Sequence, residues 1–167
     1  ILSEGLNAVL SLSAGVIEDS FAVGYALDGD DVLETIDDTE IYVVKPGSKD
    51  IRLTNNDTVD SAPVFSSFNG TGALYWYNEG NILFVTQLDA EPDRVFSGAK
   101  PGLKDDFKVV EGSKNETAII WANTTRESSA IYTAIYDADS ATWSDAVKLS
   151  DVAGEIQSPD GVFDDNG

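Results

Sequence analysis

Short apolar runs separated by polar, glycine-containing turns recur along the chain. Three of them align on a central aromatic residue, and they are SFAVGYALD at 20–28, GALYWYNEG at 72–80 and TAIIWANTT at 117–125. The central residues are Tyr25, Trp76 and Trp121, which follow one another at intervals of 51 and 45 residues. A period of this length, built only from strand-like segments, is typical of the blades of a β-propeller.

Each repeat contains four segments that have the length and residue types of β-strands, with turn residues between them. Ile131, Thr133 and Ile135 share one face, as alternation in a strand requires. No stretch of ten residues has a convincing 3.6-residue apolar period, so we expect essentially no helix. The expected strands are Asn7–Ala14, Phe21–Leu27, Glu40–Val44, Asp50–Thr54, Ala62–Ser67, Ala73–Tyr77, Asn81–Leu88, Arg94–Ser97, Phe107–Glu111, Ala118–Ala122, Ala130–Tyr136 and Ala146–Ser150.

Three similar tripeptides mark the edges of the repeats. They are Leu-Ser-Glu at 2–4, Leu-Thr-Asn at 53–55 and Leu-Ser-Asp at 149–151. The first two lie 51 residues apart and the last two lie 96 apart, which is two repeats of 48. Each tripeptide is expected to close the fourth strand of a blade. The chain is therefore expected to open on the end of one blade, at 1–4, and to close on the first strand of another, at 155–167.

These boundaries predict an all-β protein: a β-propeller segment of about three four-stranded antiparallel blades. We expect one segment over residues 1–167, with blades at about 7–54, 62–98 and 107–150 and partial blades at 1–4 and 155–167. Three blades leave sheet faces and edges open, and closed rings remove them. We therefore expect half of a six-bladed propeller, completed by further blades from a second copy or from the rest of a longer parent chain.

The stretch RLTNNDTVDSAPVFSSFNGTGALYWY at 52–77 combines several features of a repeat edge. It contains a Leu-Thr pair, an acidic gap, a proline, a Phe-Ser pair and a glycine turn before an apolar strand. In this it resembles the blades of TolB-type and related bacterial propellers. The resemblance implies a propeller fold and leaves the function open, because propellers host enzymes, lectins and scaffolds alike.

The stretch IYTAIYDADSATWSDAVKLS at 131–150 resembles the blades of sialidase-like propellers, whose Asp-box reads Ser-x-Asp-x-Gly-x-Thr-Trp. With Trp143 as the tryptophan of the box, Thr142 fits its threonine. Ala138 stands where the box has Asp, and Ser140 stands where it has Gly, so the box is degenerate.

Composition excludes several classes of function. The 30 acidic and 10 basic side chains give a formal charge of −20, which argues against nucleic acid and against an anionic membrane surface as partners. The chain has no Cys and no His, which excludes disulfides, thiolate sites and Ser-His triads. No apolar run is long enough to span a membrane. This composition favours a secreted or cell-surface bacterial protein.

Two acidic loops are candidate calcium sites, and no other cofactor is expected. Asp28, Asp30 and Asp31 supply the hard oxygens that Ca²⁺ prefers, but the spacing does not match an EF-hand. Asp137 and Asp139 are a second candidate pair. The alternatives are a solvated loop at the first site and an Asx-type turn at the second, and both are favoured over metal binding.

Aromatic side chains are candidates for stacking against a sugar ring, because they offer apolar area with defined geometry. Tyr75, Tyr77 and Trp143 are the candidate ligand-binding residues. Trp76 and Trp121 occupy equivalent positions in two repeats, which favours packing in the core over ligand binding. Tyr75 and Tyr77 face away from Trp76 and are expected to pack between blades.

Two functions remain. The first is a non-enzymatic segment that binds a glycan or a protein, or acts as a scaffold. The second is part of a propeller enzyme acting on glycans, either a sialidase-like hydrolase or its accessory domain. The enzyme would need converging acids, tyrosines and arginines. The three arginines, Arg52, Arg94 and Arg126, do not occupy equivalent positions, and no catalytic residue stands out.

Overall fold

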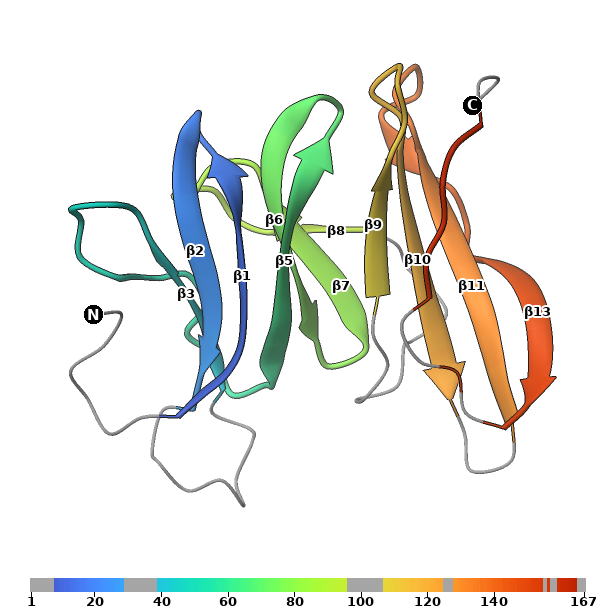
Figure 1. Ribbon diagram of the computed structural model, residues 1–167, viewed down its shortest axis with the longest axis horizontal. Helices are drawn as coiled ribbons and strands as arrows, with labels where there is room; N and C mark the ends of the chain where they lie inside the picture. The colour runs from blue at the N-terminus through green and yellow to red at the C-terminus, as the bar shows by residue number, and fades with distance from the viewer. Residues whose placement is uncertain are drawn as a thin grey trace. The chain divides into compact units, whose positions relative to one another are not determined.

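The computed structural model describes residues 8–28, 39–95, 107–124, 128–154, 156 and 159–164. Within these ranges all regular structure is β-strand and no helix occurs, as the apolar pattern predicts. The strands form three antiparallel sheets in chain order, each built from one of the predicted repeats (Figure 1).

The first sheet has the order β1-β2-β3-β4. Its strands are β1 (Val9–Ile17), β2 (Ser20–Leu27), β3 (Glu40–Val44) and β4 (Ile51–Arg52). The turn between β1 and β2 consists of Glu18 and Asp19, which have φ angles of 50° and 56°. Two residues at positive φ match the twist of a hairpin, so this short turn fixes the register of the pair.

The second sheet has the order β5-β6-β7-β8. Its strands are β5 (Asp60–Phe68), β6 (Thr71–Asn78), β7 (Asn81–Val85) and β8 (Asp93–Arg94). Asn69-Gly70 and Glu79-Gly80 form its two-residue turns, and all four residues have positive φ. Asn-Gly is a strong short-range signal for such a hairpin.

The third sheet has the order β12-β11-β10-β9, and a further strand, β13, also pairs with β11. Its strands are β9 (Phe107–Glu111), β10 (Thr117–Thr124), β11 (Ser128–Asp137), β12 (Thr142–Trp143) and β13 (Val147–Ala153). The strand expected at Ala146–Ser150 corresponds to β13. The short strand β12 is an addition that the sequence pattern did not predict.

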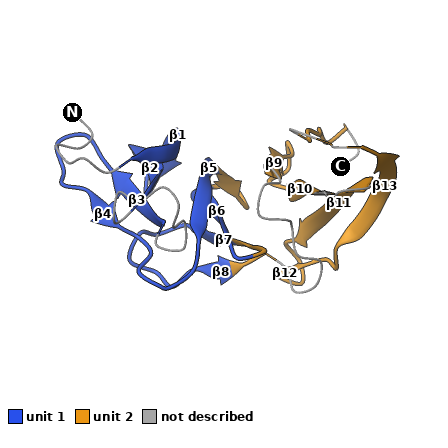
Figure 2. Cartoon of the chain, turned by 90° about the horizontal axis from the view of Figure 1, so that it is seen from below, with its two compact units in different colours: residues 1–65, 72–79, 83–93 blue, residues 66–71, 80–82, 94–167 orange. Residues whose placement is uncertain are grey.

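The chain divides into two compact units (Figure 2). Unit 1 comprises residues 1–65, 72–79 and 83–93, and unit 2 comprises residues 66–71, 80–82 and 94–167. The first sheet lies in unit 1 and the third in unit 2, whereas the second sheet contributes residues to both.

The core of unit 1 is apolar, and most of its side chains are aliphatic. Its buried members are Ile17, Ala22, Ala26, Ile41, Val43, Leu74, Trp76 and Val85. The three central aromatic residues of the repeats are buried as expected: Tyr25 is 2% exposed, and Trp76 and Trp121 are both fully covered. Burial raises the pKa of the Tyr25 phenol, whose hydroxyl donates a hydrogen bond to Asp50 at 2.5 Å.

Each sheet has two distinct faces, because side chains alternate along its second strand. The aromatic face of a sheet is the one that carries its central aromatic residue, Tyr25, Trp76 or Trp121. The alanine face is the opposite one, which carries Ala22, Ala73 or Ala118. These alanines are at most 6% exposed.

Candidate functional site

The first predicted calcium loop lies only in part within the described residues. Asp28 directly follows β2 and is 1% exposed, so its carboxylate belongs to the interior. Asp30 and Asp31 lie outside the described residues. A calcium site in this loop therefore stays a prediction.

The second predicted calcium pair forms a turn at the end of β11. Asp137 accepts hydrogen bonds from the Asp139 amide at 2.9 Å, from the Ser140 amide at 3.4 Å and from the Ser140 hydroxyl at 2.9 Å. These are the bonds of an Asx-type turn. They lower the pKa of Asp137, with the Ser140 hydroxyl contributing most. Both carboxylates are exposed to solvent.

The predicted sugar-stacking residues lie in different environments. Tyr75 is fully buried and Tyr77 is 4% exposed, and the ring of Tyr75 stacks on Phe84 at 5.3 Å between centroids. Trp143 in β12 is half-buried. Its ring lies 5.5 Å from that of Tyr136 and 6.1 Å from that of Phe68. Of the three candidates, Trp143 is the one with a substantially exposed surface.

A buried polar network in unit 1 is centred on Asp60, a residue that the sequence did not single out. Asp60 begins β5 and is fully covered. Its carboxylate accepts three hydrogen bonds, each of 2.8 Å, from the Trp76 indole and from the side-chain amides of Asn78 and Asn56. Desolvation by burial raises the pKa of Asp60, and the three donors only partly offset this effect.

Glu40, at the start of β3, is the second acid of this network and is 2% exposed. Its Oε1 accepts hydrogen bonds from the Arg52 guanidinium at 2.8 Å and from the Asn56 amide at 2.9 Å. Its Oε2 is buried and has no hydrogen-bond partner among the residues that the structure describes. The negative charge of Glu40 also helps to raise the pKa of Asp60.

The network connects the loop between β4 and β5 to the strands on either side of it. Asn56 bridges the two acids, since its backbone amide bonds Glu40 and its side-chain amide bonds Asp60. The Thr54 hydroxyl accepts a hydrogen bond from the Ile41 amide at 2.8 Å. A network of this kind stabilises a loop as it is and provides oxygen ligands only if its existing bonds are broken.

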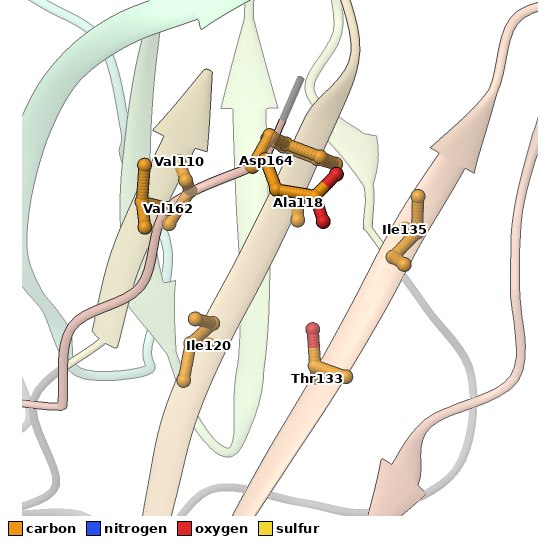
Figure 3. Close-up of a pocket in the computed structure, with 8 residues that line it drawn as sticks. Val110, Ala118, Ile120, Thr133, Ile135, Val162 and Asp164 are labelled. Carbon is orange, nitrogen blue, oxygen red and sulfur yellow. The ribbon is translucent and has the colours of Figure 1, made fainter. Parts of the chain in front are cut away.

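A cavity of about 330 Å³ lies on the alanine face of the third sheet, beneath the extended segment 159–164 (Figure 3). Val110, Ala118, Ile120, Thr133 and Ile135 of the sheet line it. Val162, Phe163 and Asp164 of the overlying segment complete the lining. Six of the eight lining residues are apolar, and the polar ones are Thr133 and Asp164.

Within the described ranges, no group of three or more acidic side chains is arranged to hold a metal ion. The described part of the chain also has no helix with the length and hydropathy needed to cross a bilayer. No protein-family model, no curated protein and no solved structure matches the chain.

Proposed function

We propose that the chain is a β-propeller segment of about three blades that serves in non-enzymatic binding or scaffolding, in a bacterial protein that is secreted or lies on the cell surface. One observation carries the fold part of the proposal. Three consecutive antiparallel sheets, two of four strands and one of five, each place a buried aromatic residue at the same position of the second strand. Equivalent buried residues at a period near 50 are what stacking of blades requires.

The use for binding is supported by how the described acids are employed. Asp60 accepts three hydrogen bonds from its neighbours, and Glu40 pairs with Arg52. A general acid or nucleophile must reach a substrate, whereas these two carboxylates are buried in a structural network. Arg94 lies in the short strand β8, and Arg126 lies outside the described residues.

The aromatic cluster of Phe68, Tyr136 and Trp143 in unit 2 is the surface that we propose for ligand contact. Its rings lie within 4.5 to 6.1 Å of one another, and Trp143 is half-buried. The exposed Asp137 is the last residue of β11. An aromatic plane beside polar acceptors suits a sugar ring, which has apolar faces and a hydroxylated rim. The same cluster would serve an enzyme acting on glycans as its accessory domain, which is the second candidate.

The test is a glycan array probed with the purified chain, with and without Ca²⁺. We expect binding to a restricted set of glycans that is lost in Trp143→Ala. The control is Ile51→Ala, because Ile51 is an apolar side chain of β4 in the first sheet that is 38% exposed. If Trp143→Ala still binds the same glycans, the ligand-binding surface is not the cluster around Trp143. Cleavage of the arrayed glycans would overturn the non-enzymatic function.

A further inference from the structure

The aromatic face of the first sheet is open to solvent at Leu12, Val16 and Phe21, whereas Tyr25 on the same face is 2% exposed. Leu12 pairs with Tyr25, and Val16 pairs with Phe21, so these side chains share the face of Tyr25. Leu12 is 61% exposed, Val16 is 51% exposed and Phe21 is 55% exposed. A run of large exposed apolar side chains on one sheet face is a mark of an interaction surface.

Unit 1 shows what covers an aromatic face. Trp76 and Leu74, which carry the equivalent face of β6, are fully buried, in one cluster with Ala22 and Ala26 from the alanine face of the first sheet. A Cβ atom built on Gly24, between those alanines, would lie 3.3 Å from Leu74. In unit 1 the partner of an aromatic face is therefore the alanine face of the preceding repeat, where Ala22, Gly24 and Ala26 leave room for Leu74 and Trp76.

The third sheet has an alanine face that is partly open. Ala118 pairs with Ile135, and Thr133 pairs with both Ile120 and Val147, so these residues share that face. The segment 159–164 covers the part of the face over β9 and β10 (Figure 3). Ile135, which also lines the cavity beneath that segment, is 46% exposed. Val147 is 53% exposed, and Val162 on the segment itself is 89% exposed.

We infer that the aromatic face of the first sheet binds the alanine face of the third sheet of a second copy of this chain. The inference rests on the proposed propeller segment and names its partner. Leu12, Val16 and Phe21 of one copy would pack against Ile135 and Val147 of the other, with the exposed Val162 at the rim. In a two-fold dimer this contact is made twice, once in each direction.

Charge determines how this association responds to salt. Each copy carries a formal charge of −20, so two copies repel one another at low ionic strength. Salt screens this repulsion while the apolar contact is retained. The dimer therefore tightens as NaCl is raised, whereas a dimer held by ion pairs loosens.

The absence of cysteine from the chain allows a clean test by disulfide trapping. Leu12→Cys and Val147→Cys are prepared as separate proteins and mixed under mild oxidation. We expect the mixture to form a disulfide-linked dimer containing one chain of each kind. The double variant should form a dimer closed by two disulfides. The control is Asp139→Cys, because Asp139 is an exposed residue of the β11–β12 turn.

Three results would overturn the inference. One is cross-linking of Leu12→Cys with itself as fast as with Val147→Cys, which would mean that two identical faces meet. Another is cross-linking to Asp139→Cys at the same rate. The third is a wild-type chain that stays a monomer of 17.8 kDa, measured by light scattering at high protein and salt concentration. The open faces would then be expected to bind further blades of a longer parent chain. A trapped dimer that binds no glycan would count against the proposed binding function alone, and a monomer that binds a glycan would count against this inference alone.

Discussion

Asp60 in unit 1 and Asp137 in unit 2 each accept three hydrogen bonds, yet their pKa values move in opposite directions. The pKa of Asp60 is raised and that of Asp137 is lowered. Asp60 is fully covered, whereas Asp137 is exposed in its turn. Removal from water dominates at the first residue, and nearby donors dominate at the second. The number of hydrogen bonds therefore does not determine which protonation state the fold favours.

The two acids also differ in the reach of their partners. The carboxylate of Asp137 accepts hydrogen bonds from residues of its own turn, two and three positions away. Asp60 bonds Trp76 and Asn78, which lie 16 and 18 positions away in another strand. The first arrangement shapes a local loop, and the second connects separate parts of unit 1.

The largest effect is expected from Asp60→Ala. Removing the carboxylate leaves the buried Trp76 indole N–H without its acceptor, and the partly buried Asn78 amide and the exposed Asn56 amide also lose theirs. Each buried donor left unsatisfied costs about 1–3 kcal/mol, so we expect a loss of about 3 kcal/mol in the free energy of unfolding. Denaturant melts measure this loss. Asp57→Ala, in the exposed part of the same loop, is the control and should change stability by no more than about 0.5 kcal/mol. Equal effects of the two changes would show that Asp60 has no special role.

A smaller loss is expected from Trp76→Phe, which keeps an aromatic ring and removes the N–H donor to Asp60. A hydrogen bond to a charged group contributes about 1.5–3 kcal/mol, so we expect a loss of about 2 kcal/mol. The loss should shrink when the same change is made in an Asp60→Asn background, because the charged acceptor is then absent. A double-mutant cycle from denaturant melts measures this coupling. Strict additivity would contradict it.

The third prediction concerns the pH dependence that Asp60 imposes. Its pKa in the folded state lies above the unfolded value, so the folded protein holds the proton more tightly between the two values. Stability relative to Asp60→Asn should therefore rise as pH falls from neutral towards the unfolded pKa, which is about 3.9 for Asp. Denaturant midpoints of both proteins at pH 7, 6, 5 and 4 measure the trend. If the stability of the wild type relative to Asp60→Asn decreases as pH falls, the pKa of Asp60 is lowered in the folded state, and burial is not the dominant cause of its shift.

The smallest effect is expected from Asp137→Ala. The pKa of Asp137 is lowered in the folded state, so its contribution is present above the unfolded pKa and is lost as pH falls through the folded pKa. Solvent screens this exposed group, and the melting midpoint should hardly move at neutral pH. An NMR titration of the carboxyl group gives the pKa directly. Ser140→Ala should raise that pKa towards its ordinary value, because the hydroxyl is the main cause of the shift.

Strands with a strong local signal could be predicted from the sequence. The ranges expected for Glu40–Val44 and Phe107–Glu111 coincide with β3 and β9. The strand expected at Asp50–Thr54 is shorter in the structure, where β4 covers Ile51–Arg52. Outer strands of this kind pair on one side only, so apolar pattern constrains their ends weakly. Both β12 and β13 pair with β11. The apolar pattern within a single strand does not indicate which other strands will pair with it, so this arrangement could not be predicted.

The Asp60 network was missed for a related reason. Glu40, Asn56 and Asn78 are ordinary polar residues of strand ends and loops when seen in the sequence. They come together only when three strands and a loop have been placed. One signal was available, because Asp60 lies two residues before the strand expected at Ala62–Ser67 and 16 residues before Trp76, which was expected to be buried. The Asp137 turn, whose bonds are local, could be predicted from its residue types.

The pairing pattern of the strands has a consequence for how the protein is made. Every described pairing lies within one sheet, and the sheets occupy separate stretches of the chain, Val9–Arg52, Asp60–Arg94 and Phe107–Ala153. A ribosome that adds about 5–20 residues per second needs about 3–10 s for one repeat, whereas a hairpin forms in about 1–10 μs. Each sheet can therefore assemble before the next has left the ribosome. Synthesis from the N-terminus then leaves little time in which strands of different sheets compete for the same partner.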